Sequence, residues 1–122
     1  MGNTVKLKDV KKDEYPGTPV EVGDADLDEL VKSYPAVVID CWAPWCGPCR
    51  AMGPAIDELA REMRGKVMFA KLNTDDNEQM AARFKIMAIP TLLFFKKGEL
   101  AERSTGLVAK RNLEAMLKKV FG

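Results

Sequence analysis

Two cysteines, Cys46 and Cys49, are separated by Gly47-Pro48 near the middle of the chain. Two thiols at this spacing can cycle between a dithiol and a disulfide, which is the chemistry of thiol–disulfide exchange. The spacing is typical of a redox motif when it lies within a β-α-β pattern. The alternative, two buried apolar thiols or a passive disulfide, is uncommon in a protein of the reducing cytosol. The pair therefore predicts a redox site.

The chain contains no histidine and only three cysteines. A structural zinc site needs about four Cys or His ligands, and Cys–His or Ser–His catalytic pairs need an imidazole. The composition argues against both kinds of site. Cys46 must therefore become nucleophilic without an imidazole base.

Two predicted elements meet at the cysteine pair. Residues 36–42 form an apolar run without regular polar alternation, which is typical of a buried central strand. Both sulfurs then lie at the N-terminus of the next helix, where free N–H groups and the helix dipole favour a thiolate. Their i, i+3 spacing brings both side chains to one face of the first turn, where Pro48 is tolerated. This helix stops near Gly65 and has an apolar face made by Met52, Ile56, Leu59, Ala60 and Met63.

The predicted elements follow the order β-α-β-α-β-α-β-β-α. The crossovers favour parallel pairing, and a hairpin turn at Lys97-Gly98 adds an antiparallel edge. The fold class is therefore α/β, with a central mixed sheet flanked by helices on both faces. The predicted strands cover residues 18–22, 36–42, 67–72, 91–95 and 100–105.

The other helices are predicted from their first residues and their apolar faces. Asp24 is a suitable N-cap for a helix that carries Leu27, Leu30 and Val31 on one face. Asp75 and Glu78 resemble a capping box that opens a helix ending near residue 84. The last helix has an apolar stripe made by Leu113, Met116, Leu117, Val120 and Phe121.

The composition is that of a globular protein with a single domain. The 122 residues are 47% hydrophobic and 30% charged, with a net charge of +1 that gives no reason to expect nucleic acid or an acidic membrane as partner. No apolar run is long enough to span a bilayer, and the first residues lack a secretory signal, so we expect a cytoplasmic protein. Residues 1–17 are polar and are interpreted as a loosely held N-terminal extension, and residues 18–122 as the domain.

The residues around the pair carry a resemblance to a known family. The segment 42–50, Trp-Ala-Pro-Trp-Cys-Gly-Pro-Cys-Arg, resembles the active-site signature of the thioredoxin family. Ile89-Pro90-Thr91 stands where that family has a cis-proline, and Gly106 where it has a glycine near the site. The similarity extends from about Pro19 to Phe121, so it implies a thioredoxin fold.

The resemblance also implies a mechanism. Cys46 would be the exposed nucleophile and Cys49 the more buried resolving thiol of a general protein-disulfide reductant. The Gly47-Pro48 spacer resembles that of reducing members. No cofactor is implied beyond the Cys46–Cys49 disulfide. The implied partners of this monomer are disulfide-containing proteins and a thioredoxin reductase-type donor, either NADPH-linked or ferredoxin-linked.

Two charged residues lie unexpectedly within predicted buried strands. A carboxylate at Asp40 is costly unless it is paired or protonated, and burial would raise its pKa toward the range of a proton acceptor for Cys49. The family uses an aspartate at this position in that way. If the two strands are neighbours, Lys71 can partner Asp40, a pairing that the resemblance supports. The alternatives are backbone N–H partners for Asp40 and a lysine that extends to solvent.

The expected substrate-binding residues are Trp45, Ile89, Pro90 and Gly106. Trp45 would form an apolar wall beside the attacking sulfur, although Trp45 and Trp42 also fit a simple packing role. With a cis bond at Pro90, which only the resemblance predicts, the Ile89 backbone would be free to bind an extended substrate strand.

Cys41 departs from the family, which usually has an aromatic residue at this position. Strand alternation places it on the face opposite Asp40, so we expect a buried, inert thiol that does not reach Cys49. A regulatory thiol is the alternative.

Two other functions are compatible with the sequence. An oxidase or isomerase would use the same chemistry, but the Gly47-Pro48 spacer and the lack of a signal argue against it. A binding module would use the fold only as a rigid partner surface.

Overall fold

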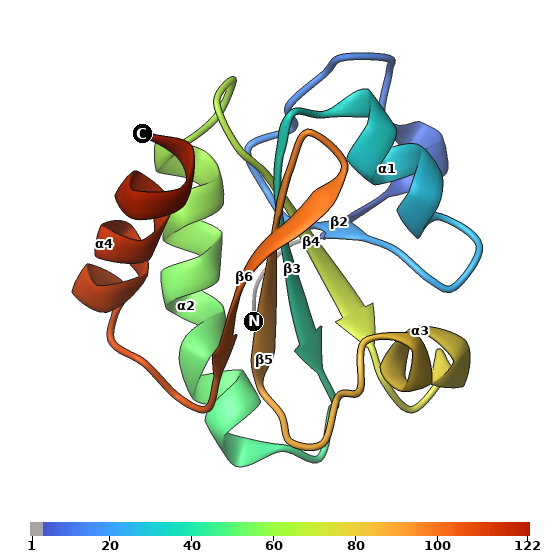
Figure 1. Ribbon diagram of the computed structural model, residues 1–122, viewed down its shortest axis with the longest axis vertical. Coiled ribbons are helices and arrows are strands. Elements are labelled where there is room, and N and C mark those ends of the chain that lie inside the picture. Colours follow the sequence, from blue (N-terminus) through green and yellow to red (C-terminus); the bar gives the residue numbers. More distant parts are fainter. Residues whose placement is uncertain (1–3) are drawn as a thin grey trace.

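A six-stranded mixed sheet forms the centre of the molecule in a computed structural model that describes residues 4–122 (Figure 1). The strand order is β1-β2-β4-β3-β5-β6. The first four strands in this order are parallel, whereas β5 is antiparallel to β3 and β6 to β5. The mixed sheet is thus confirmed. The strands are β1 (Val5–Lys6), β2 (Val20–Glu21), β3 (Ala36–Trp42), β4 (Met68–Asn73), β5 (Thr91–Lys96) and β6 (Glu99–Thr105).

Helices cover both faces of the sheet, as Figure 1 shows, with α2 and α4 on one side and α1 and α3 on the other. A short 3₁₀ helix, η1 (Leu7–Asp9), follows the first strand. The flanking helices confirm the α/β layers that the sequence predicts. They are α1 (Leu27–Ser33), α2 (Gly47–Glu62), α3 (Glu78–Arg83) and α4 (Lys110–Phe121).

The alternation of side chains along β3 divides the core into two parts. Val37, Ile39 and Cys41 pack with the α1 and α3 side, and Ala36 and Val38 with the α2 and α4 side. Helix α2 is fixed on the sheet by its buried face, so its first turn is held at the carboxyl end of β3. That face consists of Cys49, Met52, Ile56, Leu59 and Ala60.

The N-terminal segment is more ordered than the loose extension expected for residues 1–17. Strand β1 pairs in parallel with β2, and the side chains of Leu7, Val10 and Tyr15 pack against the core. The Tyr34 hydroxyl donates a hydrogen bond of 2.6 Å to the Glu14 carbonyl. The sequence prediction missed this packing because a two-residue strand carries no recognisable periodicity. Residues 1–3 lie outside the described residues.

Two predicted helix caps are wrong. Helix α1 begins after Asp26, whereas the Asp24 carboxylate accepts backbone hydrogen bonds from Gln79 and Met80 at 3.3 and 2.8 Å, in the first turn of α3. Asp24 follows β2, which lies beside β4, so the loops after these two strands meet and the cap forms between distant segments. Asp75 does not cap α3, whose N-cap is residue 77.

The hairpin between β5 and β6 is confirmed. Lys97 and Gly98 both have positive φ angles, 51° and 84°, as a two-residue turn of this kind requires. Among residues 4–122, no helix has the length and apolar character needed to cross a bilayer.

Candidate active site

Cys46 and Cys49 form a disulfide at the first turn of α2, with their Cα atoms 5.3 Å apart. Cys46 is the N-cap of the helix, and its sulfur accepts a hydrogen bond of 3.2 Å from the backbone N–H of Cys49. After reduction, the same N–H and the positive end of the helix dipole would stabilise a thiolate on Cys46. The backbone N–H and the helix dipole would therefore lower the pKa of the Cys46 thiol, a role that a histidine side chain has in Cys–His sites.

The two sulfurs differ in access, although both residues are buried. Cys46 is 4% exposed and Cys49 is 2% exposed, so the expectation of an exposed Cys46 is wrong for this disulfide form. The reason is that Ala43, Trp42 and Ile89 pack around the pair. Cys46 nevertheless lines an open hollow of about 500 Å³, whereas Cys49 does not. The order of access therefore agrees with attack by Cys46.

Trp45 forms an exposed wall beside the disulfide. Its side chain is 68% exposed, and its indole N–H donates a hydrogen bond of 3.0 Å to the Asp75 carboxylate. Met87, which is 92% exposed, lines the same hollow. The two residues leave an apolar surface next to Cys46, of the kind that marks a docking site.

Residues from two loops complete the rim of the site. The Ile89–Pro90 peptide bond is cis, as the resemblance implied. The Ile89 carbonyl oxygen lies 3.8 Å from the Cys46 sulfur. Gly106, with a φ of +95°, donates a backbone hydrogen bond of 2.8 Å to the Pro90 carbonyl. The predicted substrate-binding residues therefore lie around one hollow or in direct contact with its rim.

Asp40 is buried beneath the site on the α2 side of the sheet. The residue is 1% exposed, and neither carboxylate oxygen has a hydrogen-bond partner among the described residues. Burial raises the pKa of Asp40 from 3.8 to about 6, while the positive charge of Lys71 opposes this rise and the negative charge of Asp57 adds to it. The carboxyl group is thus placed to exchange a proton near neutral pH.

Lys71 lies beside Asp40 without pairing to it directly. The two residues are in register on β4 and β3. No ion pair within 4 Å joins them in the described part of the chain, and the Lys71 ammonium instead lies 4.6 Å from the centre of the Trp42 ring. The two strands are neighbours, and the positive charge of Lys71 limits the rise of the Asp40 pKa as predicted, although no direct ion pair forms.

Cys41 lies on the opposite face of β3, within the α1 and α3 core. Burial raises the pKa of its thiol to about 12, the negative charge of Asp40 adds to this rise, and Arg103 opposes it. Such a thiol is almost entirely protonated at neutral pH and is a poor nucleophile. The geometry therefore favours the inert role over a regulatory one.

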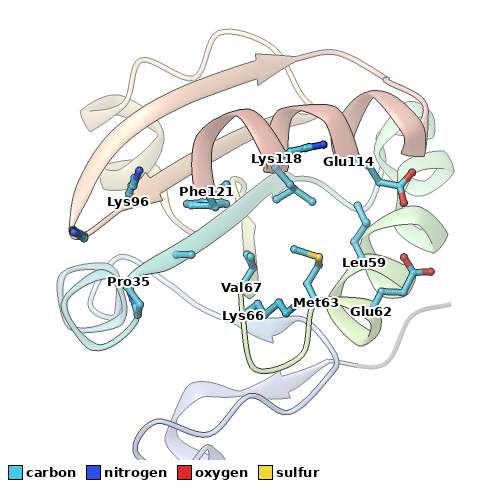
Figure 2. A pocket seen from close by; sticks show the side chains of 14 residues that line it. Pro35, Leu59, Glu62, Met63, Lys66, Val67, Lys96, Glu114, Lys118 and Phe121 are labelled. Carbon is cyan, nitrogen blue, oxygen red and sulfur yellow. The ribbon is translucent and has the colours of Figure 1, made fainter.

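A second cavity lies at the other end of the sheet. Figure 2 shows that it is lined from α2 by Leu59 and Glu62, from the residue after α2 by Met63, and from α4 by Glu114 and Lys118. It begins where β3 begins, whereas the disulfide follows the end of that strand. In residues 4–122 no cluster of His, Cys, Asp or Glu is arranged to hold a metal ion.

Three residues near the site were not predicted from the sequence to belong to it. Asp57 lies eight positions after Cys49 on α2, and its Oδ1 is buried without a hydrogen-bond partner. Asp75, interpreted as a helix cap, binds Trp45 instead, and Met87 has no distinguishing motif. Only the i+8 spacing from Cys49, which corresponds to about two helical turns, was available as a signal for Asp57.

Comparisons with known proteins agree with this geometry. The family model named Thioredoxin matches residues 18–119. The chain is 48% identical over 99 residues to "Thioredoxin M-type, chloroplastic" of Pisum sativum, covering 80% of this chain and 58% of the relative. It is 43% identical over 100 residues to "Thioredoxin" of a Synechocystis species, covering 81% and 94%. Among solved structures, a mutant thioredoxin from Halobacterium salinarum NRC-1 has a TM-score of 0.82 at 30% identity, covering 88% of this chain and 94% of that one.

A mixed sheet between two helical layers, with a disulfide-bonded cysteine pair at the start of α2, defines an α/β protein with a candidate redox site. The family match and the level of identity make the assignment specific. The chain belongs to the thioredoxin family. It spans somewhat more than half the length of the pea and spinach relatives, 58% and 55% respectively.

Proposed function

We propose that this chain is a thiol–disulfide oxidoreductase that acts as a general reductant of protein disulfides. One observation carries the proposal: the Cys46–Cys49 disulfide lies at a helix N-terminus, and Cys46 lines an open hollow. Such a pair can be reduced, attack a second disulfide and return to the oxidised form without any bound cofactor. Membership of the thioredoxin family supports this interpretation.

The reaction has two exchange steps. The Cys46 thiolate attacks one sulfur of a client disulfide, a mixed disulfide forms, and the other client sulfur leaves as a thiolate. Cys49 then loses its proton and attacks the Cys46 sulfur, which releases the second client thiolate. The client gains two electrons, and the pair becomes the disulfide seen here.

Asp40 serves as the proton acceptor for Cys49 in the second step. With a pKa near 6, most of the carboxyl is ionised at pH 7 and can take a proton, yet it remains basic enough to hold one briefly. The burial of Asp40 on the α2 side supports this role. The positive charge of Lys71, in register on β4, limits the rise of the Asp40 pKa.

Client proteins dock on the apolar rim of the hollow. Trp45 supplies a large exposed contact area, and Gly47 and Pro48, both exposed, leave the first turn of α2 accessible. The Ile89 carbonyl beside Cys46 offers a hydrogen-bond acceptor to an extended client strand, next to Pro90 and Gly106.

The proposed setting follows from the same chemistry. A dithiol reductant needs a separate reductase-type donor and disulfide-containing clients, and it suits a reducing compartment such as the cytoplasm. Two plant relatives carry the word chloroplastic in their names, so fractionation of cells that express this chain is the direct test of location. We further propose that residues 18–122 form the monomeric redox domain and residues 1–17 an N-terminal extension, of which residues 5–15 pack on the domain.

The proposed activity is tested by mixing the prereduced chain with a model protein that contains accessible disulfides. Two client thiols should be released for each Cys46–Cys49 pair that becomes oxidised. Cys46→Ser should abolish the reaction, and Cys41→Ser is the matched control that should retain it, because Cys41 lies on the other face of β3. Retained reduction by Cys46→Ser would refute the proposal.

A second measurement separates a reductant from an oxidase or isomerase. Equilibration of the pair with glutathione gives its reduction potential. We expect a potential clearly more negative than the roughly −180 mV of an isomerase. A reduction potential as high as that of an oxidase would instead indicate that the chain oxidises its client thiols.

A further inference from the structure

Three charged residues form a row across neighbouring strands beneath the disulfide. Asp40 on β3 is in register with Lys71 on β4, and Lys71 is in register with Glu21 on β2. Asp40 is buried, Lys71 is half-buried and Glu21 is exposed, so the row becomes more exposed from β3 toward β2, which the edge strand β1 follows. The core residues on either side of Asp40 and Lys71 show that both side chains face α2.

Helix α2 contributes a second carboxylate to the same region. Asp57 follows Cys49 by two helical turns, and Gly53 lies midway between them on that face. A Cβ atom at Gly53 would meet nothing within 4 Å, so this stretch of the helix leaves open space. Asp57 is half-buried, and its Oδ1 is fully buried with no hydrogen-bond partner. A buried carboxylate oxygen without a partner requires a nearby positive charge or a proton to offset its desolvation.

Lys71 is the cation that faces both carboxyl groups. Its ammonium forms no ion pair within 4 Å in residues 4–122, and it lies against the Trp42 ring instead. An ammonium paired directly with Asp40 would hold that carboxylate in its charged form and weaken it as a base. In the described part of the chain, no direct ion pair therefore commits Lys71 to Asp40.

We propose that Asp57 is a positioning residue of the redox site, whose carboxylate competes with Asp40 for the Lys71 ammonium and so leaves Asp40 able to take the Cys49 proton. This inference rests on the proposed function for its role in turnover, but its electrostatic content does not depend on any client. Asp57 does not touch the reacting sulfurs; it acts through Lys71 and Asp40.

The electrostatics of the cluster support this arrangement. Burial raises the pKa of Asp57, while Lys71 and Arg61 oppose the rise. Lys71 lowers and Asp57 raises the pKa of Asp40, so one ammonium is shared by two acids. The register partner of Asp40 on β5 is the apolar Leu92, which contributes no charge.

The test is a ¹³C NMR titration of the Asp40 carboxyl in the oxidised protein, which needs neither client nor donor. In Asp57→Asn the titration midpoint should fall by about half to one pH unit, because a like charge is removed and Lys71 can turn toward Asp40. Asp57→Ser is the second variant if the amide perturbs folding. Glu114→Gln, beside the cavity at the opposite end of the sheet, removes the same charge and should leave the midpoint unchanged.

A double-mutant cycle tests the route through Lys71. In a Lys71→Met background, the effect of Asp57→Asn should shrink to less than half, because the shared cation is gone. An equal shift in both backgrounds would overturn the competition for Lys71. An equal shift in Glu21→Gln would also overturn the proposal, because it would show that any acid near Lys71 has the effect.

Kinetics supply the second readout. Resolution of a preformed mixed disulfide on Cys46 should slow at pH 8 in Asp57→Asn, because Asp40 becomes a weaker base, and the acid limb of its pH profile should move to lower pH by the NMR shift. An unchanged NMR midpoint would refute the positioning role even if the chain reduces disulfides. A shifted midpoint in a chain without reductase activity would instead refute the proposed function and leave the charge coupling established.

Discussion

Replacement of Asp40 by asparagine should stabilise the oxidised protein at neutral pH. The carboxyl is 1% exposed and has no hydrogen-bond partner among the described residues, and its pKa is raised from 3.8 to about 6. A pKa difference of about two pH units between the folded and unfolded chain corresponds to about 3 kcal/mol. Because the folded state binds the proton more tightly, this cost is absent below pH 3.8 and complete above pH 6.

The sign of the effect is therefore fixed. As pH rises from about 4 to 7, this group alone should lower the free energy of unfolding of the wild type by about 3 kcal/mol, whereas Asp40→Asn does not titrate. The difference in unfolding free energy between variant and wild type should accordingly increase by about 3 kcal/mol over this range. Titrations of the other carboxyls cancel in the difference.

Urea denaturation of both oxidised proteins at pH 4, 5, 6 and 7 measures this difference. Asp76→Asn, the same substitution at an exposed residue, controls for the change in net charge. A difference that stays constant with pH would show that Asp40 does not carry a raised pKa. That result would also remove its proposed role as the base for Cys49.

Three further substitutions or modifications give independent checks. Trp45→Ala should raise the KM for protein disulfides several-fold but change stability by less than about 0.5 kcal/mol, because the side chain is 68% exposed; steady-state kinetics and urea denaturation measure the two effects. Cys41, with a thiol pKa of about 12, should resist alkylation at pH 8 in the folded, reduced protein and react once it is unfolded, as mass spectrometry would show. Asp24→Ala should lower the free energy of unfolding by about 1–2 kcal/mol, because the first turn of α3 loses its carboxylate acceptor; thermal or urea denaturation measures the loss.

Local patterns were sufficient to predict the parts of the fold that present the cysteines. The apolar run at residues 36–42 and the helical periodicity that follows it correspond to β3 and α2, and their junction places the disulfide at the helix start. These features depend on short-range periodicity, which the sequence displays directly. The cis bond before Pro90 is different, because only the family resemblance, and no physical property of the neighbouring residues, predicted it.

Contacts between distant segments could not be predicted in this way. Asp24 caps a helix more than fifty residues away, and its position only two residues before Asp26 made a local cap equally plausible. Asp57 has the sequence surroundings of an ordinary exposed helical acid, and its buried oxygen becomes evident only once α2 is placed against β4. Both cases depend on which strands are neighbours, a property of the whole sheet.

The short distance along the chain between the bonded cysteines has a consequence for the thermodynamics of folding. A cross-link stabilises a protein largely by restricting the unfolded chain, and the restriction grows with the length of the closed loop. Cys46 and Cys49 are three positions apart, so their bond should remove only about 2 kcal/mol of chain entropy, against about 4.7 kcal/mol for a loop of 100 residues. Opening or closing the bond therefore restricts the unfolded chain much less than a long-range cross-link would, so redox cycling should change the free energy of unfolding only modestly through this effect.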